Sequence, residues 1–203
     1  MRTTSATDLG IRLARPDDRA TVAYTLAAAF FDDPVTEWLI PDIARRHQVI
    51  DRVFELYAAA YIRHDETYTT SGGQGAALWL PPNRELLTPE EGEAFGAEIE
   101  ELLGEDARRA FLLEETFAEH HPTEPAYYLQ LVATAPDAQG RGIGSALLRE
   151  VLRQADWERM PAYLEATTER SRALYERHGY VSRGEFTLPE NGPTLYPMWR
   201  EPR

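Results

Sequence analysis

Apolar residues recur at helical spacing along several stretches of the chain. In residues 43–63, Val49, Val53 and Tyr57 lie four positions apart, and side chains at this spacing share one face of a helix. The same kind of pattern predicts helices in residues 19–31, 145–160 and 169–179, and two amphipathic helices in residues 85–119.

Runs rich in β-branched and aromatic residues predict strands between these helices. The strongest run is AYYLQLVATA, residues 126–135. Residues 66–70 and 75–82 flank the glycine-rich stretch SGGQG, which predicts a hairpin. Further strands are expected in residues 10–18, 161–167, 180–190 and 194–200.

Acidic residues and a proline mark the ends of the first helix. Asp17 or Asp18 is expected to cap its N-terminus, because short acidic side chains accept hydrogen bonds from the free amides there. Pro34 is expected to end it, because proline disfavours a helical conformation in the residue before it.

The composition indicates one globular domain and excludes several mechanisms. With 203 residues, 43% of them hydrophobic, the chain is long enough for one sizeable core. The absence of cysteine excludes a thiol nucleophile. All 21 basic residues are Arg, so no step uses a lysine; because lysine codons are A-rich, this also indicates a GC-rich bacterium.

The net charge of −13 indicates which binding partners the protein attracts or repels. It argues against nucleic-acid binding through a broad basic surface and favours cationic substrates.

No apolar run approaches the ~20 residues of a membrane span, and the N-terminal MRTTSATDLG lacks the apolar stretch of a secretory signal. A cytoplasmic location is the simplest expectation. The acids of residues 85–119 either face water or rim a pocket for a cation.

Three glycines at alternate positions, Gly140, Gly142 and Gly144, lie between the strongest strand and the next helix. Such a turn exposes backbone amides at a helix N-terminus, which is a natural anion site, and Arg141 could add a salt link. A dinucleotide fingerprint with Glu165 as its acidic residue is the competing interpretation.

Three features argue against the dinucleotide fingerprint. Residues 136–139 separate the strand from the first glycine, whereas the fingerprint begins directly after its strand. Only 59 residues follow Gly144 (203 minus 144), too few for the rest of a doubly wound sheet. The preceding strands also carry hairpin signals, which parallel crossovers do not.

Two motifs resemble those of a known family. Residues 139–144, QGRGIG, resemble the Q/R-x-x-G-x-G/A signature of the GNAT superfamily of N-acetyltransferases. Residues 171–180, SRALYERHGY, are similar to its L-Y-x-x-x-G-F segment. The likeness extends to the puromycin N-acetyltransferase-like group through TLAAAF, EPA, PDAQGRGIGSA and YERHGY, in that order.

The resemblance implies a fold and a cofactor. Residues 1–203 are expected to form a single GNAT acetyltransferase domain of α/β class. Its central sheet is expected to be mixed, mostly antiparallel and twisted, with about seven strands flanked by helices and an acidic helical segment before the fourth strand. Acetyl-CoA is the implied co-substrate, no metal is expected, and the chain is expected to be a monomer or homodimer.

The family's cofactor contacts map onto the fourth strand and the glycine loop. In the family the strand backbone pairs with the pantetheine arm, and the loop amides bind the pyrophosphate. The residues implied are Val132, Ala133 and Thr134 on the strand, and Gln139, Gly140, Arg141, Gly142, Ile143, Gly144 and Ser145 in the loop. Thr168 stands where the family commonly has a cofactor-binding Asn, and Ser171 where Ala is frequent; both are expected cofactor contacts.

The resemblance also implies a proton donor. Tyr175 matches the tyrosine that donates to the departing sulfur. Glu165 is a candidate base acting through a water, although it could equally be a surface carboxylate. His120 and His121 could also accept a proton, but their position before Pro122 favours a solvated loop. A water chain to bulk solvent is the remaining route for the amine proton.

The expected acceptor is a primary amine of a small, antibiotic- or xenobiotic-like molecule, which attacks directly in a ternary complex. Aromatic walls and a carboxylate suit such a molecule. The expected lining residues are Phe30, Phe31, Asp33, Trp38, Trp79, Tyr128 and Gln130. The alternatives are a non-catalytic acyl-CoA-binding sensor on the same fold and an O-acetyltransferase, which would need a stronger base.

Overall fold

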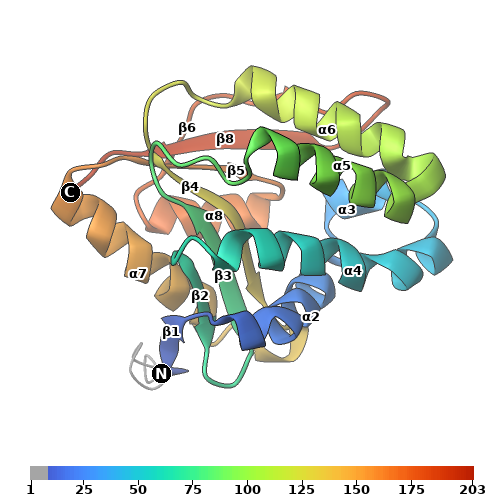
Figure 1. Ribbon diagram of the computed structural model, residues 1–203. Helices are drawn as coiled ribbons and strands as arrows, with labels where there is room; N and C mark the ends of the chain where they lie inside the picture. The colour runs from blue at the N-terminus through green and yellow to red at the C-terminus, as the bar shows by residue number, and fades with distance from the viewer. Residues whose placement is uncertain (1–8) are drawn as a thin grey trace.

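An eight-stranded mixed sheet forms the centre of the structure, a computed structural model that describes residues 9–203 (Figure 1). The strand order is β1-β2-β3-β4-β5-β8-β6, and β7 pairs with β8. The strands are β1 (Ile11–Leu13), β2 (Thr67–Thr70), β3 (Gly75–Leu80), β4 (Tyr127–Thr134), β5 (Ala162–Ala166), β6 (Val181–Ser182), β7 (Phe186–Thr187) and β8 (Thr194–Arg200). Only β4–β5 is parallel among the described pairs. This confirms the mixed, mostly antiparallel sheet, with eight strands in place of about seven.

Helices cover both faces of the sheet. They are α2 (Arg19–Phe30), α3 (Pro34–Leu39), α4 (Ile43–Ile62), α5 (Pro89–Leu103), α6 (Ala107–His120), α7 (Ile143–Glu158) and α8 (Glu169–Arg177), with 3-10 turns η1 (Pro16–Asp18), η2 (Gly104–Asp106) and η3 (Pro136–Ala138). In Figure 1, α7 lies on one side of β3 and β4, and α2 and α4 lie on the other. Residues 1–8, on which much of the expectation about a secretory signal rests, lie outside the described part.

Strand β3 separates two hydrophobic cores. Ala76 and Leu78 pack with residues of α2 and α4, whereas Ala77 and Trp79 pack with residues of α7. Successive side chains of a strand point to opposite faces, so the continuous apolar run of β3 is buried on both sides. Burial of β3 on both faces joins the two helical layers into one domain.

Strand β4 contains a bulge at Gln130. Its neighbour β3 pairs Leu78 with Leu131 and Trp79 with Leu129, so Gln130 has no direct partner in the ladder. A bulge of this kind adds one residue to one strand and bends that strand locally. The irregularity therefore falls in the middle of the longest strand.

The bulge changes which residues of β4 face each core. Tyr127 and Leu129, before the bulge, pack with the α7 core. Leu131 and Ala133, after it, pack with the α2–α4 core. One extra residue reverses the alternation of a strand, so odd-numbered residues face opposite sides on either side of Gln130.

Strands β4 and β5 are neighbours only at their first residues. The parallel register joins Tyr127 to Ala162 and Tyr128 to Tyr163, and no further pair follows. β3, by contrast, pairs with β4 as far as Thr134. From Leu129 onward, β4 therefore has a ladder partner on one edge only, within the described residues.

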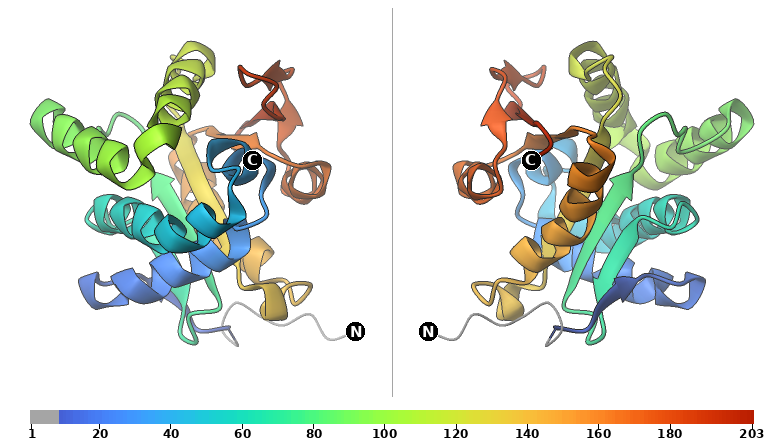
Figure 2. Two further views of the ribbon diagram at one scale, coloured as in Figure 1. Left: turned by 90° about the vertical axis from the view of Figure 1, so that its right-hand side faces the viewer. Right: turned by 90° about the vertical axis from the view of Figure 1, so that its left-hand side faces the viewer.

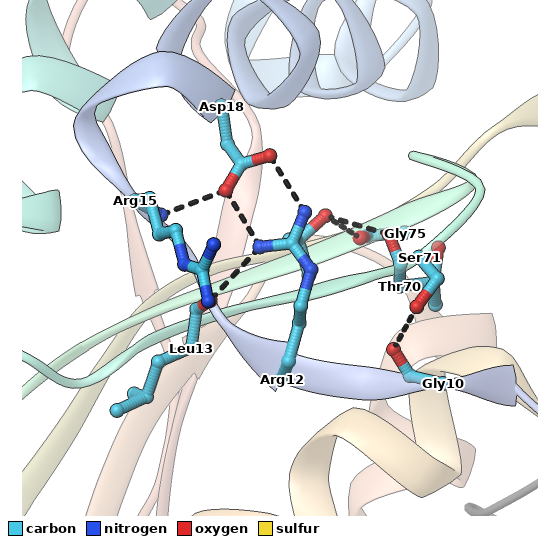
Figure 3. A network of polar contacts seen from close by, with 9 residues as sticks. Gly10, Arg12, Leu13, Arg15, Asp18, Thr70, Ser71 and Gly75 are labelled. Carbon is cyan, nitrogen blue, oxygen red and sulfur yellow. Dashed lines mark hydrogen bonds and ion pairs between the residues drawn. The ribbon is translucent and has the colours of Figure 1, made fainter.

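The start of α2 differs from the expectation. Asp18 does not cap the helix with its side chain. Its carboxylate instead accepts two hydrogen bonds from the Arg12 guanidinium, at 2.6 and 2.7 Å, and one from the Arg15 backbone at 2.7 Å (Figure 3). The hydrogen bonds from Arg12 lower the pKa of Asp18 to about 2. The paired charge ties β1 to η1, because a bidentate guanidinium bond outcompetes a cap.

Pro34 does more than end α2. It is the first residue of α3, and Asp33 caps that helix by accepting a hydrogen bond from the Val35 amide at 2.9 Å. Proline suits the first helical position, since its missing N–H has no partner there anyway. The motif expected to be a helix stop is therefore also a helix start.

The acidic stretch forms the two expected helices, α5 and α6. Glu90, Glu98, Glu114 and Glu115 are exposed on them, which favours a solvated acidic face over a cation pocket. Within residues 9–203, no helix is both long and apolar enough to cross a membrane.

Gly75 permits the close approach of α7 to β3. A Cβ atom at this position would lie 2.5 Å from Ile143 Cγ2 and 3.2 Å from the Ala133 carbonyl oxygen. We expect Gly75→Ala to lower the free energy of unfolding by about 1–3 kcal/mol, the usual cost of overpacking. Urea denaturation measures this, with Gly72→Ala as the control, because a Cβ there meets only Gln74 atoms at 3.6 Å or more. Equal midpoints for the two variants would contradict the packing argument.

Candidate active site

A cavity of about 800 Å³ lies beside the free edge of β4. Its walls come from the α2–α3 segment, α4, α6, β4, the loop before α7, β5 and α8. In both views of Figure 2, α5 and α6 stand on one side of β4 and the C-terminal strands on the other. The cavity thus gathers segments that are distant in the sequence.

The glycine loop presents a helix N-terminus to this cavity. Gly140 and Gly142 have φ values of 76° and 82°, in the left-handed region that glycine tolerates. α7 begins at Ile143, and no side chain in the described part of the chain caps it. The first amides of a helix have no intrahelical acceptor. Unpaired donors and the helix dipole therefore favour an anion at this end of the cavity.

The backbone of β4 borders the same cavity. Every residue from Tyr128 to Thr134 lines it, including Val132 and Ala133. Backbone amides and carbonyls that lack a ladder partner need another partner or water. The unpaired edge of β4 is therefore a ready site for an extended ligand that can pair with a strand.

Tyr175, on α8, lines the cavity. The residue is only 7% exposed, and its ring packs edge-on against Tyr180 with centroids 5.9 Å apart. Burial, and then the charge of Asp33, raise the pKa of Tyr175. The phenol therefore stays protonated well above neutral pH and is available as a donor.

Glu165, at the end of β5, is a buried carboxylate. Its side chain is 3% exposed, so the alternative of a surface carboxylate is wrong. The Tyr128 hydroxyl donates to its Oε2 at 2.9 Å, while its Oε1 has no hydrogen-bond partner within the described residues. Burial and the charge of Glu165 raise the pKa of Tyr128 well above its ordinary value. Both side chains line the cavity.

Gln130 and Asp33 lie on the cavity wall and are fixed by hydrogen bonds. The Gln130 Oε1 accepts from the Tyr61 hydroxyl at 3.0 Å. Asp33 accepts from the Thr167 hydroxyl at 2.6 Å, which links the start of α3 to the end of β5. Burial raises the pKa of Asp33 despite these hydrogen bonds.

Thr168 and Ser171 line the cavity through the first turn of α8. They form a reciprocal capping box: the Ser171 amide donates to Thr168 Oγ1 at 3.1 Å, and the Thr168 amide donates to Ser171 Oγ at 3.2 Å. Their hydroxyls already satisfy helix amides, which accounts for polar residues at both positions.

Four residues expected at the site do not line the cavity. Trp79 is fully buried against α7, because strand alternation turns it to the opposite face. Phe31 packs on the ring of His47, with centroids 4.3 Å apart. Trp38 lies in a separate cluster with Phe186 and Leu188. The structure does not bring these three side chains to the cavity.

Arg141, the fourth of these residues, also does not line the cavity. It donates to the Asp137 carbonyl at 2.8 Å and is exposed. In this arrangement the guanidinium, expected to form a salt link to a ligand, bonds to the backbone of its own loop. The other residues expected to bind the cofactor in this loop do line the cavity: Gln139, Gly140, Gly142, Ile143, Gly144 and Ser145.

Several cavity residues were missed. They are chiefly Phe54, Tyr57, Leu113, Phe117, Thr167, Arg170 and Arg177. The helical pattern did place Tyr57 on an apolar face, and Leu113 and Phe117 fall four positions apart on α6. A periodic stripe indicates a face that is buried but does not say whether protein or ligand covers it. Residues 9–203 contain no cluster of three His, Asp or Glu side chains suited to a metal ion.

The chain is similar to known acetyltransferases. The family model described as "Acetyltransferase (GNAT) domain" matches residues 96–182. An uncharacterized N-acetyltransferase of Schizosaccharomyces pombe is 27% identical over 199 residues, covering 91% of this chain and 80% of that protein.

Solved structures have the same architecture. A Corynebacterium glutamicum structure, described as histone acetyltransferase HPA2 and related acetyltransferase, is 28% identical with a TM-score of 0.74 and covers 95% of this chain and 96% of that one. Arylalkylamine N-acetyltransferase 2 of Aedes aegypti, at 14% identity and a TM-score of 0.65, covers 95% and 98% and is evidence for the fold alone. The mixed sheet, the matched segment and these relatives agree: the chain has the GNAT fold, its residues 96–182 match a GNAT acetyltransferase domain, and it is an acetyl-CoA-dependent N-acetyltransferase.

Proposed function

We propose that the chain transfers an acetyl group from acetyl-CoA to a primary amine of a small molecule, by direct attack in a ternary complex. The observation that carries this proposal is that one cavity joins the unpaired edge of β4 and the amide-rich N-terminus of α7 to Tyr175 and Glu165. A donor site and two proton-transfer groups thus share one space.

The cofactor occupies the half of the cavity bounded by β4 and the glycine loop. Its pantetheine arm pairs with the backbone of residues 132–134, in the manner of an added strand. Its pyrophosphate accepts hydrogen bonds from the amides of residues 142–145, where the helix dipole adds to the attraction. Arg170 and Arg177, which line the same cavity, supply positive charge for the phosphates.

The reaction needs two proton transfers. Glu165 takes a proton from the amine, directly or through a water, and the freed lone pair forms the C–N bond with the thioester carbon. As the C–S bond breaks, its electron pair goes to sulfur, the Tyr175 hydroxyl passes its proton to the developing thiolate, and the second proton lost by the nitrogen restores the phenol. The buried, protonated phenol of Tyr175 and the Glu165 oxygen that lacks a partner within residues 9–203 are the two groups suited to these roles.

The acceptor half of the cavity suits an amine with an apolar or aromatic body. Phe30, Phe54, Tyr57 and Phe117 contribute aromatic walls, and the net charge of −13 attracts cations. The resemblance to the puromycin N-acetyltransferase-like group makes aminonucleosides one candidate class. We propose a small, antibiotic- or xenobiotic-like amine as the acceptor.

The glycine loop provides a test of the cofactor site. Gly142→Val would place a branched side chain at a left-handed position and in the path of the phosphates. We expect acetyl-CoA affinity, measured by calorimetry, to fall at least about tenfold, or roughly 1.4 kcal/mol. Gly184→Val is the control, because Gly184 also has a positive φ, of 116°, and does not line the cavity. Unchanged affinity in a folded Gly142→Val variant would remove the loop from the site.

Tyr175→Phe tests the proton donor. Loss of one hydroxyl should preserve the fold and the cofactor affinity while lowering kcat by roughly 10²–10⁴-fold, the range of general acid catalysis. Tyr180→Phe is the matched control, since Tyr180 is equally buried beside Tyr175 and does not line the cavity. Near-normal turnover in Tyr175→Phe would mean that water protonates the sulfur.

An acceptor screen tests the function as a whole. Release of CoA thiol from acetyl-CoA should appear with one or more of aminonucleosides, aminoglycosides, polyamines or aryl amines, and more slowly with histone-like peptides. Increasing salt should slow the reaction at low substrate concentration, because it screens the attraction of a cation to the protein. A clear preference for peptides would overturn the proposed acceptor class. Binding of acetyl-CoA without transfer to any amine would favour the acyl-CoA sensor.

A further inference from the structure

The proposed reaction leaves one proton to be removed from a buried site. Small aliphatic amines are ammonium ions at neutral pH. An ammonium ion and a thioester give an amide, a thiol and one free proton, because the sulfur takes up only one of the two protons that the nitrogen loses. Glu165 can accept the first proton, but its side chain is 3% exposed. The carboxylate therefore needs a route by which to return that proton to solvent.

His121 lies at the outer end of such a route. Its Nδ1 is 3.7 Å from Glu165 Oε1, the oxygen that lacks a hydrogen-bond partner among the described residues. A small rotation of either side chain brings the two atoms within hydrogen-bond distance. The His121 side chain is 40% exposed and does not line the cavity. It thus contacts the buried carboxylate from the solvent side.

Two tyrosines fix the orientation of the His121 ring. The imidazole packs edge-on against Tyr128 and Tyr163, with centroids 4.6 and 5.1 Å away and interplanar angles of 89° and 82°. Tyr128 also donates to the other oxygen of Glu165. The cavity-facing carboxylate, the tyrosine and the imidazole therefore form one contiguous cluster.

The titratable groups that face the His121 ring come from β4 and β5. Glu165 and Tyr163 face the imidazole from β5, and Tyr128 faces it from β4. Arg183, whose charge reaches Tyr163, lies 3.9 Å over the Trp199 ring and 3.5 Å from Glu124. Glu165 is thus the one carboxylate in direct range of the His121 ring within residues 9–203.

The adjacent histidine does not share this position. His120 Nδ1 lies 2.8 Å from the Thr116 carbonyl oxygen, and its ring stacks on Phe186 with centroids 4.1 Å apart. It therefore serves as an internal control for exposure, residue type and place in the chain.

We infer that His121 relays the acceptor's proton from Glu165 to solvent, so that the buried carboxylate can accept a proton again in the next cycle. The inference rests on the proposed function and adds to it a residue outside the cavity. Neutral Nδ1 accepts the proton from Glu165, and the imidazolium then loses a proton to water through its exposed edge. Only N–H and O–H bonds form or break in these steps. His121 acts through Glu165 and does not line the cavity, so it is a positioning residue for the base and not a catalytic residue.

The test is the pH profile of kcat for His121→Phe with an amine identified in the acceptor screen. Phenylalanine retains the edge-on contacts with both tyrosines and removes the ring nitrogens. We expect kcat near neutral pH to fall about tenfold or more, with the KM for acetyl-CoA unchanged. Because an imidazole accepts a proton only when neutral, the wild-type kcat should contain a limb that decreases toward acid pH, and the variant should lack the contribution of His121 to this limb.

Two further variants separate a proton relay from a structural effect. His120→Phe should keep the wild-type rate and profile. His121→Gly should be slow in a non-nucleophilic buffer and recover on addition of imidazole, which can occupy the vacated space and accept the proton. Circular dichroism verifies the fold of each variant.

The outcomes distinguish this inference from the function on which it depends. If His121→Phe has a normal rate and profile, or if imidazole fails to rescue His121→Gly, the relay is overturned while the acetyltransferase activity stands. If the wild-type protein acetylates no amine but binds acetyl-CoA, the proposed function itself fails. The relay is supported if the pH profile of His121→Phe lacks the acid limb and imidazole restores the rate of His121→Gly.

Discussion

The structure depends on the point at which β4 and β5 part. The two strands pair only through Tyr127 and Tyr128, and beyond them the backbone of β4 has a free edge. Unpaired backbone groups are costly when no partner or water reaches them, so a protein retains such an edge where a ligand can use it. The divergence also opens the space that becomes the cavity. Strand β4 remains anchored by its long ladder with β3, so the sheet tolerates the gap.

The bulge at Gln130 adjusts β4 to this geometry. It reverses the alternation of side chains, so that the first half of the strand packs on α7 and the second half on α2 and α4. The bulged residue itself lines the cavity and accepts a hydrogen bond from Tyr61. One inserted residue therefore serves both cores and the site, which agrees with the general occurrence of bulges beside functional sites.

Burial gives the polar groups of the cavity different tasks. The phenol of Tyr175 is kept protonated by its surroundings, which suits a donor. Glu165 has one oxygen occupied by Tyr128 and one without a partner within the described residues, which suits an acceptor of a proton. Asp33, although carboxylic, is engaged in capping α3 and binding Thr167, which makes it part of the scaffold. The same chemical group thus has different roles according to its hydrogen bonds.

The sequence by itself determined the elements whose signals are local. Helical periodicity placed α4, hairpin signals placed β2 and β3, and the motif around Gly142 placed a glycine-rich loop before α7, because each depends on neighbours a few positions away. The tertiary structure decided what depends on distant segments: the burial of Glu165 beside His121, the turn of Trp79 away from the cavity, and the contribution of α6 to its wall. Periodicity states that a face is covered, and only the packing of elements far apart in the chain decides what covers it. The start of α3 at Pro34 and the pairing of Asp18 with Arg12 likewise required the folded chain, since competing partners decided which hydrogen bond each acid makes.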